Sequence, residues 1–153
     1  MSEKISNEKS YGCVPVCPHG QGNFLLVQNA DDDGSSDHWG FPKGHKEPYE
    51  YEVDTATREL EEETGLLPDE LAKDEIFQES YQYKKEGQLI EKRNTYYLAL
   101  FAEMRKPESQ TDEILDACWV RYETAKDKMQ YQSSRDILTE AYMRLTMNGL
   151  IEQ

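Results

Sequence analysis

Four glutamates lie within five positions, at Glu59 and at residues 61–63. On an α-helix, Glu59, Glu62 and Glu63 stand at positions i, i+3 and i+4, so their carboxylates gather on one face. Like charges at this spacing repel each other by roughly a few tenths of a kcal/mol per pair in water. Hard divalent cations such as magnesium remove this penalty, and they usually bind a few carboxylates together with substrate phosphates. The cluster therefore predicts a metal site on a helix.

The surrounding residues indicate where this helix begins, ends and packs. Small or apolar residues follow the i, i+3, i+4, i+7 spacing of a buried helix face, at Val53, Ala56, Thr57 and Leu60. Pro48 suits the approach to a first turn, and Gly65 suits a left-handed cap at the end. The preceding segment WGFPKGH, residues 39–45, is a short apolar run that breaks into a loop, and its two glycines allow a tight turn.

The same segment resembles a complete Nudix box. The matching positions have the spacing of the box and are Gly44, Glu50, Arg58-Glu59-Leu60, Glu62-Glu63 and Gly65-Leu66. A match at this many fixed positions is far more specific than a lone glycine motif. The resemblance implies an α/β Nudix fold, a mixed β-sheet sandwiched between α-helices. It also implies a pyrophosphohydrolase in which water attacks a phosphoanhydride with the help of divalent metal.

The resemblance also implies roles for individual residues. Glu62 and Glu63 would be the main metal ligands, and Glu59 would be either a ligand or the catalytic base. Arg58 would hold the glutamates through charge-assisted hydrogen bonds rather than touch substrate. Lys43 would offer its carbonyl to the metal, while its amine would either meet a phosphate or remain solvated. The implied cofactor is Mg²⁺, with Mn²⁺ as the alternative.

Many Nudix enzymes supply another carboxylate from outside the box. Candidates occur in the acidic segment before Trp119, at Glu108, Asp112, Glu113 and Asp116. By resemblance we favour Glu113, six residues before Trp119, as a further metal ligand. The alternative for Glu113 is an ordinary acidic loop residue.

Segments outside the box are similar to asymmetric diadenosine tetraphosphate hydrolases. They are residues 38–45 (HWGFPKGH), 24–28 (FLLVQ) and 95–99 (TYYLA), together with Trp119, and the resemblance covers roughly residues 11–145. It implies hydrolysis of diadenosine tetraphosphate to ATP and AMP. Tyr49, where relatives often have a small residue, and the long aspartate-rich loop before His38 depart from the pattern.

Four residues are expected to contact that substrate. They are Lys43, His45, Tyr96 and Lys92. Tyr96 is the candidate for stacking on adenine, because the family places such a tyrosine on this strand, and its alternative is a place in the core. Lys92 belongs to a basic cluster with Lys84, Lys85 and Arg93, which would either contact the tetraphosphate or be exposed hairpin charges.

The charge balance limits the class of partner. The chain has 17 basic and 31 acidic residues, a net charge of −14. This opposes binding to duplex nucleic acid and leaves a small-molecule nucleotide as the expected partner. One alternative is a pyrophosphohydrolase of RNA 5′-triphosphate ends, which the charge weakly disfavours, or a hydrolase of another nucleoside-diphosphate-linked substrate. A less favoured alternative is a nucleotide sensor that does not hydrolyse its ligand, since a sensor need not keep the costly glutamates.

The remaining residues predict one domain at 10–153 behind a flexible leader at 1–9. Expected strands are residues 11–16, 24–28, 75–83, 88–104 and 117–120. Residues 88–104 are apolar on both faces and should form a central strand. A helical turn is expected at 122–128, and a last helix capped by Ser133 or Ser134 should end at Gly149. Residues 29–37 and 107–112 should be loops.

Three cysteines, Cys13, Cys17 and Cys118, form no metal-binding pattern, and ordinary packing is their expected role. We find no signal peptide and no apolar run long enough to cross a membrane, which predicts a cytoplasmic protein. We expect a monomer or a weak homodimer.

Overall fold

A curled mixed sheet with helices on both faces forms the protein. The computed structural model describes residues 5–30 and 37–152. Its main sheet has the order β3-β2-β1-β6-β5, made of β1 (Ile5–Cys17), β2 (Asn23–Ala30), β3 (Asp37–Gly40), β5 (Glu70–Lys85) and β6 (Gln88–Leu100). Two further strands join it: β4 (Lys43–Gly44) pairs with β1, and β7 (Ile114–Val120) pairs with β2.

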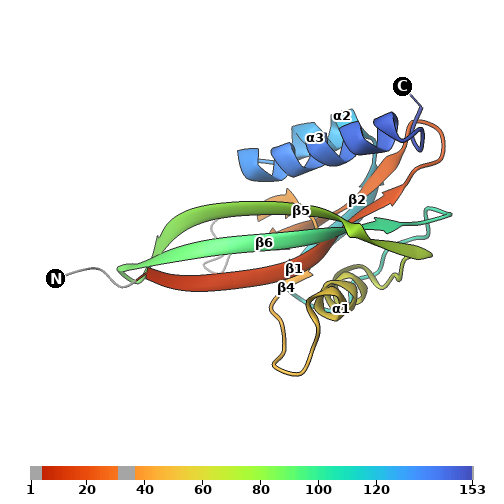
Figure 1. Ribbon diagram of the computed structural model, residues 1–153. Helices are drawn as coiled ribbons and strands as arrows, with labels where there is room; N and C mark the ends of the chain where they lie inside the picture. Colours follow the sequence, from red (N-terminus) through yellow and green to blue (C-terminus); the bar gives the residue numbers. More distant parts are fainter. Residues whose placement is uncertain (1–4, 31–36, 153) are drawn as a thin grey trace.

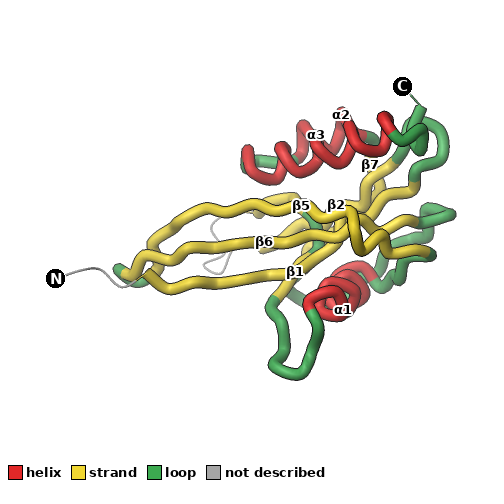
Figure 2. The backbone as a smooth tube through the Cα atoms, viewed as in Figure 1, coloured by secondary structure: helices red, strands yellow, loops and turns green. Residues whose placement is uncertain are grey.

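The helices cover opposite faces of this sheet (Figure 1). Helix α1 (Glu52–Thr64) lies on one face, and α2 (Tyr122–Lys128) with α3 (Gln132–Met147) lies on the other. The tube in Figure 2 shows that β1, β5 and β6 extend well beyond both helical layers. The predicted α/β sandwich is confirmed. None of the described helices is both long enough and apolar enough to span a bilayer.

Strand β6 is the central strand that its two apolar faces predict. It runs parallel to β1 and antiparallel to β5. Tyr96 and Leu98 belong to the core under α3, whereas Tyr97 and Ala99 belong to the core under α1. Alternate side chains of one strand therefore serve two hydrophobic layers.

The β5–β6 connection is a two-residue turn. Glu86 and Gly87 both have positive φ, at 53° and 78°. This is the geometry of a type I′ hairpin turn, whose twist matches that of the flanking strands. The hairpin predicted around residues 84–87 is confirmed, with strands longer than expected on the β5 side.

Residues 5–9 are part of β1, which corrects the prediction of a flexible leader over 1–9. Ile5 to Lys9 pair in parallel with Leu89 to Arg93 of β6. The polar composition suggested a disordered segment, but the pairing partner is more than 80 positions away in sequence and leaves no local signal. Residues 1–4 lie outside the described part of the chain.

Other boundaries differ in smaller ways. The last helix begins at Gln132 after Tyr131, and neither predicted serine caps it. Asn29, Ala30 and Asp37 lie in strands, while the rest of the predicted 29–37 loop, with its aspartates, falls outside the described residues. Cys13 and Cys17 both pack in the core under α1, and all three cysteines are free, as expected for ordinary packing.

Candidate active site

Helix α1 is held against the sheet by the apolar face that its sequence predicts. Ala56 and Leu60 are fully buried in the core beside Cys13 of β1. The helix ends at Gly65, whose φ of 73° places it in the left-handed region, and Gly65 donates its N–H to the Glu61 carbonyl. Packing and cap together fix the rotation of α1, and so fix the direction in which its glutamates point.

Strand β4 brings the backbone against those glutamates. A Cβ atom at Gly44 would overlap the Glu59 carboxylate, so a larger residue here would force that carboxylate to move. The backbone of neighbouring Lys43 hydrogen-bonds to the Glu63 carboxylate, and this bond works to lower the pKa of Glu63. The loop and the helix therefore form one unit through Glu59 and Glu63.

Glu63 is a buried carboxyl beside a second carboxyl. Glu63 is only 7% exposed, and burial together with the charge of Glu59 raises its pKa to about 9. Burial and the charge of Glu62 also raise the pKa of Glu59. A divalent cation bound between these two groups would favour the ionised form of both.

Arg58 organises the carboxylates around this pair. Its Nε donates to Glu50 Oε2 at 2.7 Å, and its Nη1 donates to Glu59 at 2.9 Å and to Glu62 at 3.1 Å. Nη2 donates to Glu50 Oε1 and to the His45 carbonyl. The Arg58 guanidinium holds the pKa of Glu50 down at about 2. The predicted role of Arg58 as the residue that positions the glutamates agrees with this geometry.

The donor set fits a hard divalent cation. Mg²⁺ and Mn²⁺ favour carboxylate oxygens as ligands, and Glu59 and Glu63 supply such oxygens. Glu63 is the buried residue of the two. Glu62 points toward Arg58, which lies between it and Glu59. Accordingly, within residues 5–30 and 37–152 no three His, Cys, Asp or Glu side chains already form a closed cage. Glu59 and Glu63 would coordinate a bound ion first. Glu62 would join them by rotating away from Arg58.

Two of the predicted substrate contacts meet close to this pair. Lys92 Nζ lies 3.2 Å from His45 Nε2 and donates to Ser10 Oγ at 2.7 Å. Burial and the charge of Lys43 lower the pKa of Lys92, and burial and the charge of Lys92 lower the pKa of His45. Lys43 and Lys92 thus supply positive charge that borders the glutamates, while His45 lies against Lys92 and its lowered pKa favours the neutral imidazole.

The rest of the predicted basic cluster does not join them. Lys84, Lys85 and Arg93 are exposed, and Arg93 directly follows Lys92 in β6. Lys84 and Arg93 point to the face opposite that of Lys92, because successive residues of a strand alternate between faces. Lys85 shares the face of Lys92 but is exposed beside the hairpin turn, so Lys92 is the buried member of this set.

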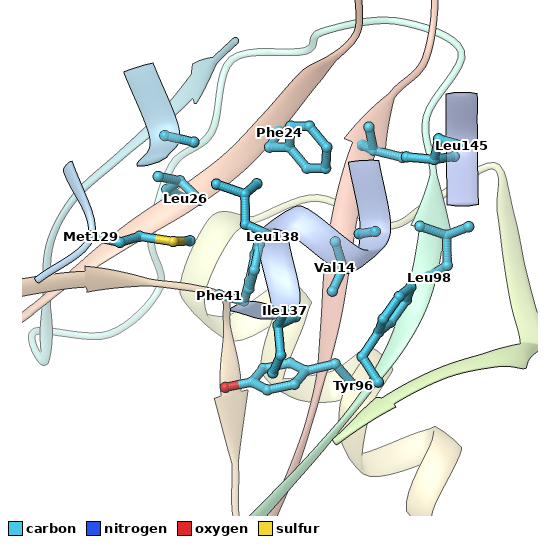
Figure 3. Packing of buried hydrophobic residues seen from close by; sticks show 14 of the residues in the cluster. Val14, Phe24, Leu26, Phe41, Tyr96, Leu98, Met129, Ile137, Leu138 and Leu145 are labelled. Carbon is cyan, nitrogen blue, oxygen red and sulfur yellow. The ribbon is translucent and has the colours of Figure 1, made fainter. Parts of the chain in front are cut away.

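Tyr96 lies in the core rather than at an open surface. It is 3% exposed, and its ring meets Phe41 edge-on with centroids 5.9 Å apart. Figure 3 shows the ring beside Ile137 of α3. Its hydroxyl donates to Glu79 Oε1 at 3.2 Å. The ring offers no open face to a base, so the structure supports the core alternative for Tyr96.

Glu113 lies in the loop that packs on the end of α1. Gln110 donates its N–H to the Glu62 carbonyl, and Glu108 donates its N–H to the Thr64 carbonyl. These bonds bring the acidic segment next to the box. The Glu113 side chain is exposed, however, and in the described part of the chain nothing joins it to the glutamates. Its role as a metal ligand stays a prediction.

Sequence reasoning missed several polar residues on this face of the sheet. Ser10, Glu79 and Asn94 lie beside Lys92 or Tyr96, and Glu8 lies 3.7 Å from Lys92. A signal was available in β6, where Lys92 and Asn94 share a strand face with the apolar residues Ile90, Tyr96 and Leu98. Buried polar residues at such positions need partners.

Comparisons with known proteins agree with this architecture. A family profile described as the NUDIX domain matches residues 7–141. The bis(5′-nucleosyl)-tetraphosphatase [asymmetrical] of Mus musculus is 29% identical over 132 residues, which cover 86% of each chain. The enzyme of the same name from Rattus norvegicus is 30% identical over 125 residues, which cover 80% of each chain.

A solved structure shows the same arrangement. The crystal structure of a C. elegans Ap4A hydrolase binary complex superposes with a TM-score of 0.67 at 25% sequence identity. The match covers 92% of this chain and 98% of that one. Relatives and fold thus point to the same family as the glutamate motif.

Proposed function

Because this chain belongs to the NUDIX domain family and is a Nudix hydrolase, we propose that it hydrolyses diadenosine tetraphosphate to ATP and AMP. Relatives named asymmetrical tetraphosphatases align over most of the chain and support this substrate. The observation that carries the proposal is the pair of half-buried Glu59 and buried Glu63 next to Lys43, His45 and Lys92. It combines a cation site with positive charge for phosphates.

The reaction adds one water across a P–O–P bridge, so one product keeps three phosphates and the other keeps one. Bound Mg²⁺ would neutralise charge on phosphate oxygens and lower the pKa of the attacking water. Glu59 and Glu63 would hold the ion. Lys92, itself buried, would attract non-bridging oxygens that the net charge of the protein otherwise repels.

Glu59 would act either as a ligand or as the base that accepts the proton from water. Its carboxylate touches both the Arg58 guanidinium and the backbone near Gly44, so its position is fixed from two sides. Arg58 contributes by fixing the positions of the Glu50, Glu59 and Glu62 carboxylates through ion pairs rather than by touching substrate.

The test is product analysis. The protein is incubated with diadenosine tetraphosphate and magnesium, and nucleotides are separated by ion exchange. We expect equal amounts of ATP and AMP, no turnover in excess EDTA, and partial turnover with Mn²⁺. Glu63→Gln should lower turnover by about tenfold or more, since it removes a charged oxygen ligand. Glu61→Gln, on the same helix at an unspecified position of the box, is the matched control and should retain activity.

Other outcomes identify other functions. Two molecules of ADP would mean symmetric cleavage and would overturn the proposed specificity. Turnover only on triphosphorylated RNA would replace the substrate with an RNA end. Binding without hydrolysis of either substrate would instead identify a nucleotide sensor.

A further inference from the structure

Glu79 and Asn94 form a polar pair directly across the β5–β6 ladder. They are opposite each other in the register, and Asn94 Nδ2 donates to Glu79 Oε1 at 2.8 Å. Asn94 is 0% exposed. The same Glu79 oxygen accepts a hydrogen bond from the Tyr96 hydroxyl. One oxygen of the carboxylate is therefore used twice.

The other oxygens of this pair have no partner. Over residues 5–30 and 37–152, Glu79 Oε2 and Asn94 Oδ1 are the two buried side-chain atoms without a hydrogen bond. Buried polar atoms are normally paired, because leaving one unpaired destabilises the fold. Two such atoms side by side on facing strands need an explanation.

The orientation of the pair determines what could satisfy it. Asn94 Nδ2 is engaged by Glu79, so Oδ1 is left as an acceptor. Ionised Glu79 is also purely an acceptor. The missing partner must therefore supply two N–H or O–H donors close together.

The pair lies along the face that carries the phosphate-binding residues. Lys92 is two positions before Asn94 on β6, and so points to the same side of the sheet. The charges of Lys43 and Glu79 both affect the pKa of Lys92, and the charge of Lys43 also affects that of Glu63. Lys92 is thus electrostatically coupled both to Lys43, which acts on Glu63, and to Glu79 of the polar pair.

Aromatic rings border the acceptors. Tyr81 is 40% exposed, and burial together with the charges of Glu79 and Tyr131 raises its pKa, although a hydrogen bond with Asn94 works to lower it. Tyr131 is 50% exposed and packs edge-on against His38. Rings of this kind are suited to stacking on a base. Tyr81 is the residue of β5 two positions after Glu79, so the two side chains lie on the same face of the sheet.

We propose that Glu79 and Asn94 read the edge of a nucleobase and select bases that carry an amino group. This inference rests on the proposed function, since it assigns the base-binding end of the same nucleotide site. Adenine offers two N–H donors on N6, and guanine offers N1–H beside its 2-amino group. Hypoxanthine has a carbonyl where adenine has its amine and lacks the guanine amine. Its carbonyl would face two acceptors.

The first experiment compares the diadenosine, diguanosine and diinosine tetraphosphates with the wild-type protein. We expect kcat/KM for the inosine compound to be about tenfold or more below the best amino-bearing substrate, because a site built for a donor rejects an analogue that lacks it. Discrimination in the guanine–hypoxanthine comparison alone would identify guanine as the preferred base, and discrimination in the adenine–hypoxanthine comparison alone would identify adenine. Equal kcat/KM values for all three substrates would overturn the proposal. A trapped water or a proton would then be the partner of the two unpaired oxygens.

The second experiment reverses the preference. Glu79→Gln keeps the shape of the side chain but replaces the unpaired acceptor with an amide donor. The ratio of amino-bearing to inosine substrate should fall by about tenfold, because the hypoxanthine carbonyl gains a donor. Glu70→Gln, an exposed change on the same strand, should leave the ratio unchanged. An unchanged ratio in folded Glu79→Gln protein would contradict the proposal.

Binding separates this inference from the proposed function. The affinities of ATP, GTP and ITP in the presence of Mg²⁺ are measured by calorimetry, which requires no cleavage of a tetraphosphate. If tetraphosphates are not cleaved but an amino-bearing nucleotide binds about tenfold tighter than ITP, the substrate assignment fails and the base reading stands. If tetraphosphates are cleaved and ATP, GTP and ITP bind with equal affinity, the base-reading proposal fails while the proposed hydrolysis stands.

Discussion

Arg58 is the side chain on which the arrangement of the glutamates depends. Its three nitrogens donate to Glu50, Glu59, Glu62 and the His45 carbonyl. A guanidinium can do this because its donors are fixed in one plane, whereas an ammonium is a single point charge. The identity of this residue therefore matters beyond its charge.

We expect Arg58→Lys to lower both activity and stability. The lysine cannot hold three carboxylates at once, so the free energy of unfolding should fall by about 1–3 kcal/mol. Turnover should fall more than substrate affinity, since Arg58 positions ligands rather than substrate. Urea unfolding and steady-state kinetics measure the two effects. Arg93→Lys, an exposed change on β6, is the control, and an equal response of both variants would contradict this role.

Glu50 gives a pH-dependent test at the same scale. Arg58 lowers the pKa of Glu50 to about 2 from an ordinary value of 4.5. The folded state thus favours ionised Glu50, so its stabilisation is present above pH 4.5 and is lost as the pH falls toward 2. Glu50→Gln should melt at a lower temperature than wild type near neutral pH, and the gap should narrow below pH 4.5. Glu47→Gln should show no such narrowing in the same melting series.

At the scale of elements, α1 is fixed by its own cap and by the loop after β6. Gly65 has a positive φ, and a Cβ there would overlap the Glu108 carbonyl. The loop carrying Glu108 and Gln110 is hydrogen-bonded to the last carbonyls of the helix. One residue therefore both ends the helix and lets the loop dock beside the glutamates.

Gly65→Ala should destabilise the protein more than Gly149→Ala. Both glycines have positive φ, 73° and 74°, but an added Cβ at Gly149 meets open space. The shared backbone penalty is about 1–2 kcal/mol, and the collision with Glu108 adds to it only at Gly65. Chemical denaturation of the two variants measures the difference. Equal losses in the free energy of unfolding would show that the loop carrying Glu108 can move aside without cost.

At the scale of the whole molecule, β1 is the strand that joins the parts. It pairs with β2, β4 and β6, and so links the β3–β4 loop to the central strand. Its first residues also reach the site, because Glu8 accepts a hydrogen bond from Tyr83 and lies 3.7 Å from Lys92.

Removing residues 1–9 should therefore cost stability. Five residues of parallel pairing with β6 are lost, which we expect to lower the free energy of unfolding by about 1–3 kcal/mol. The nucleotide affinity should also change, because Lys92 loses its Glu8 neighbour. Thermal melts of this variant are compared with those of a variant lacking only residues 1–4. If the two variants behave alike, residues 5–9 do not support the sheet.

The sequence alone determined the features that depend on local spacing. The glutamate helix, its packing face and its Gly65 cap follow from residues within a few turns of one another, and so does the hairpin at Glu86 and Gly87. The central position of β6 followed from its two apolar faces. The family followed from the fixed spacing of the box, because that spacing places particular side chains on one face of a helix.

Only the tertiary structure decided which side chains meet across strands. It placed residues 5–9 in the sheet, buried Tyr96, selected Lys92 from four basic residues, and set Asn94 opposite Glu79. Each of these outcomes depends on the register between segments distant in sequence. A shift of one residue in a strand moves every side chain to the other face, and local composition carries no record of that register.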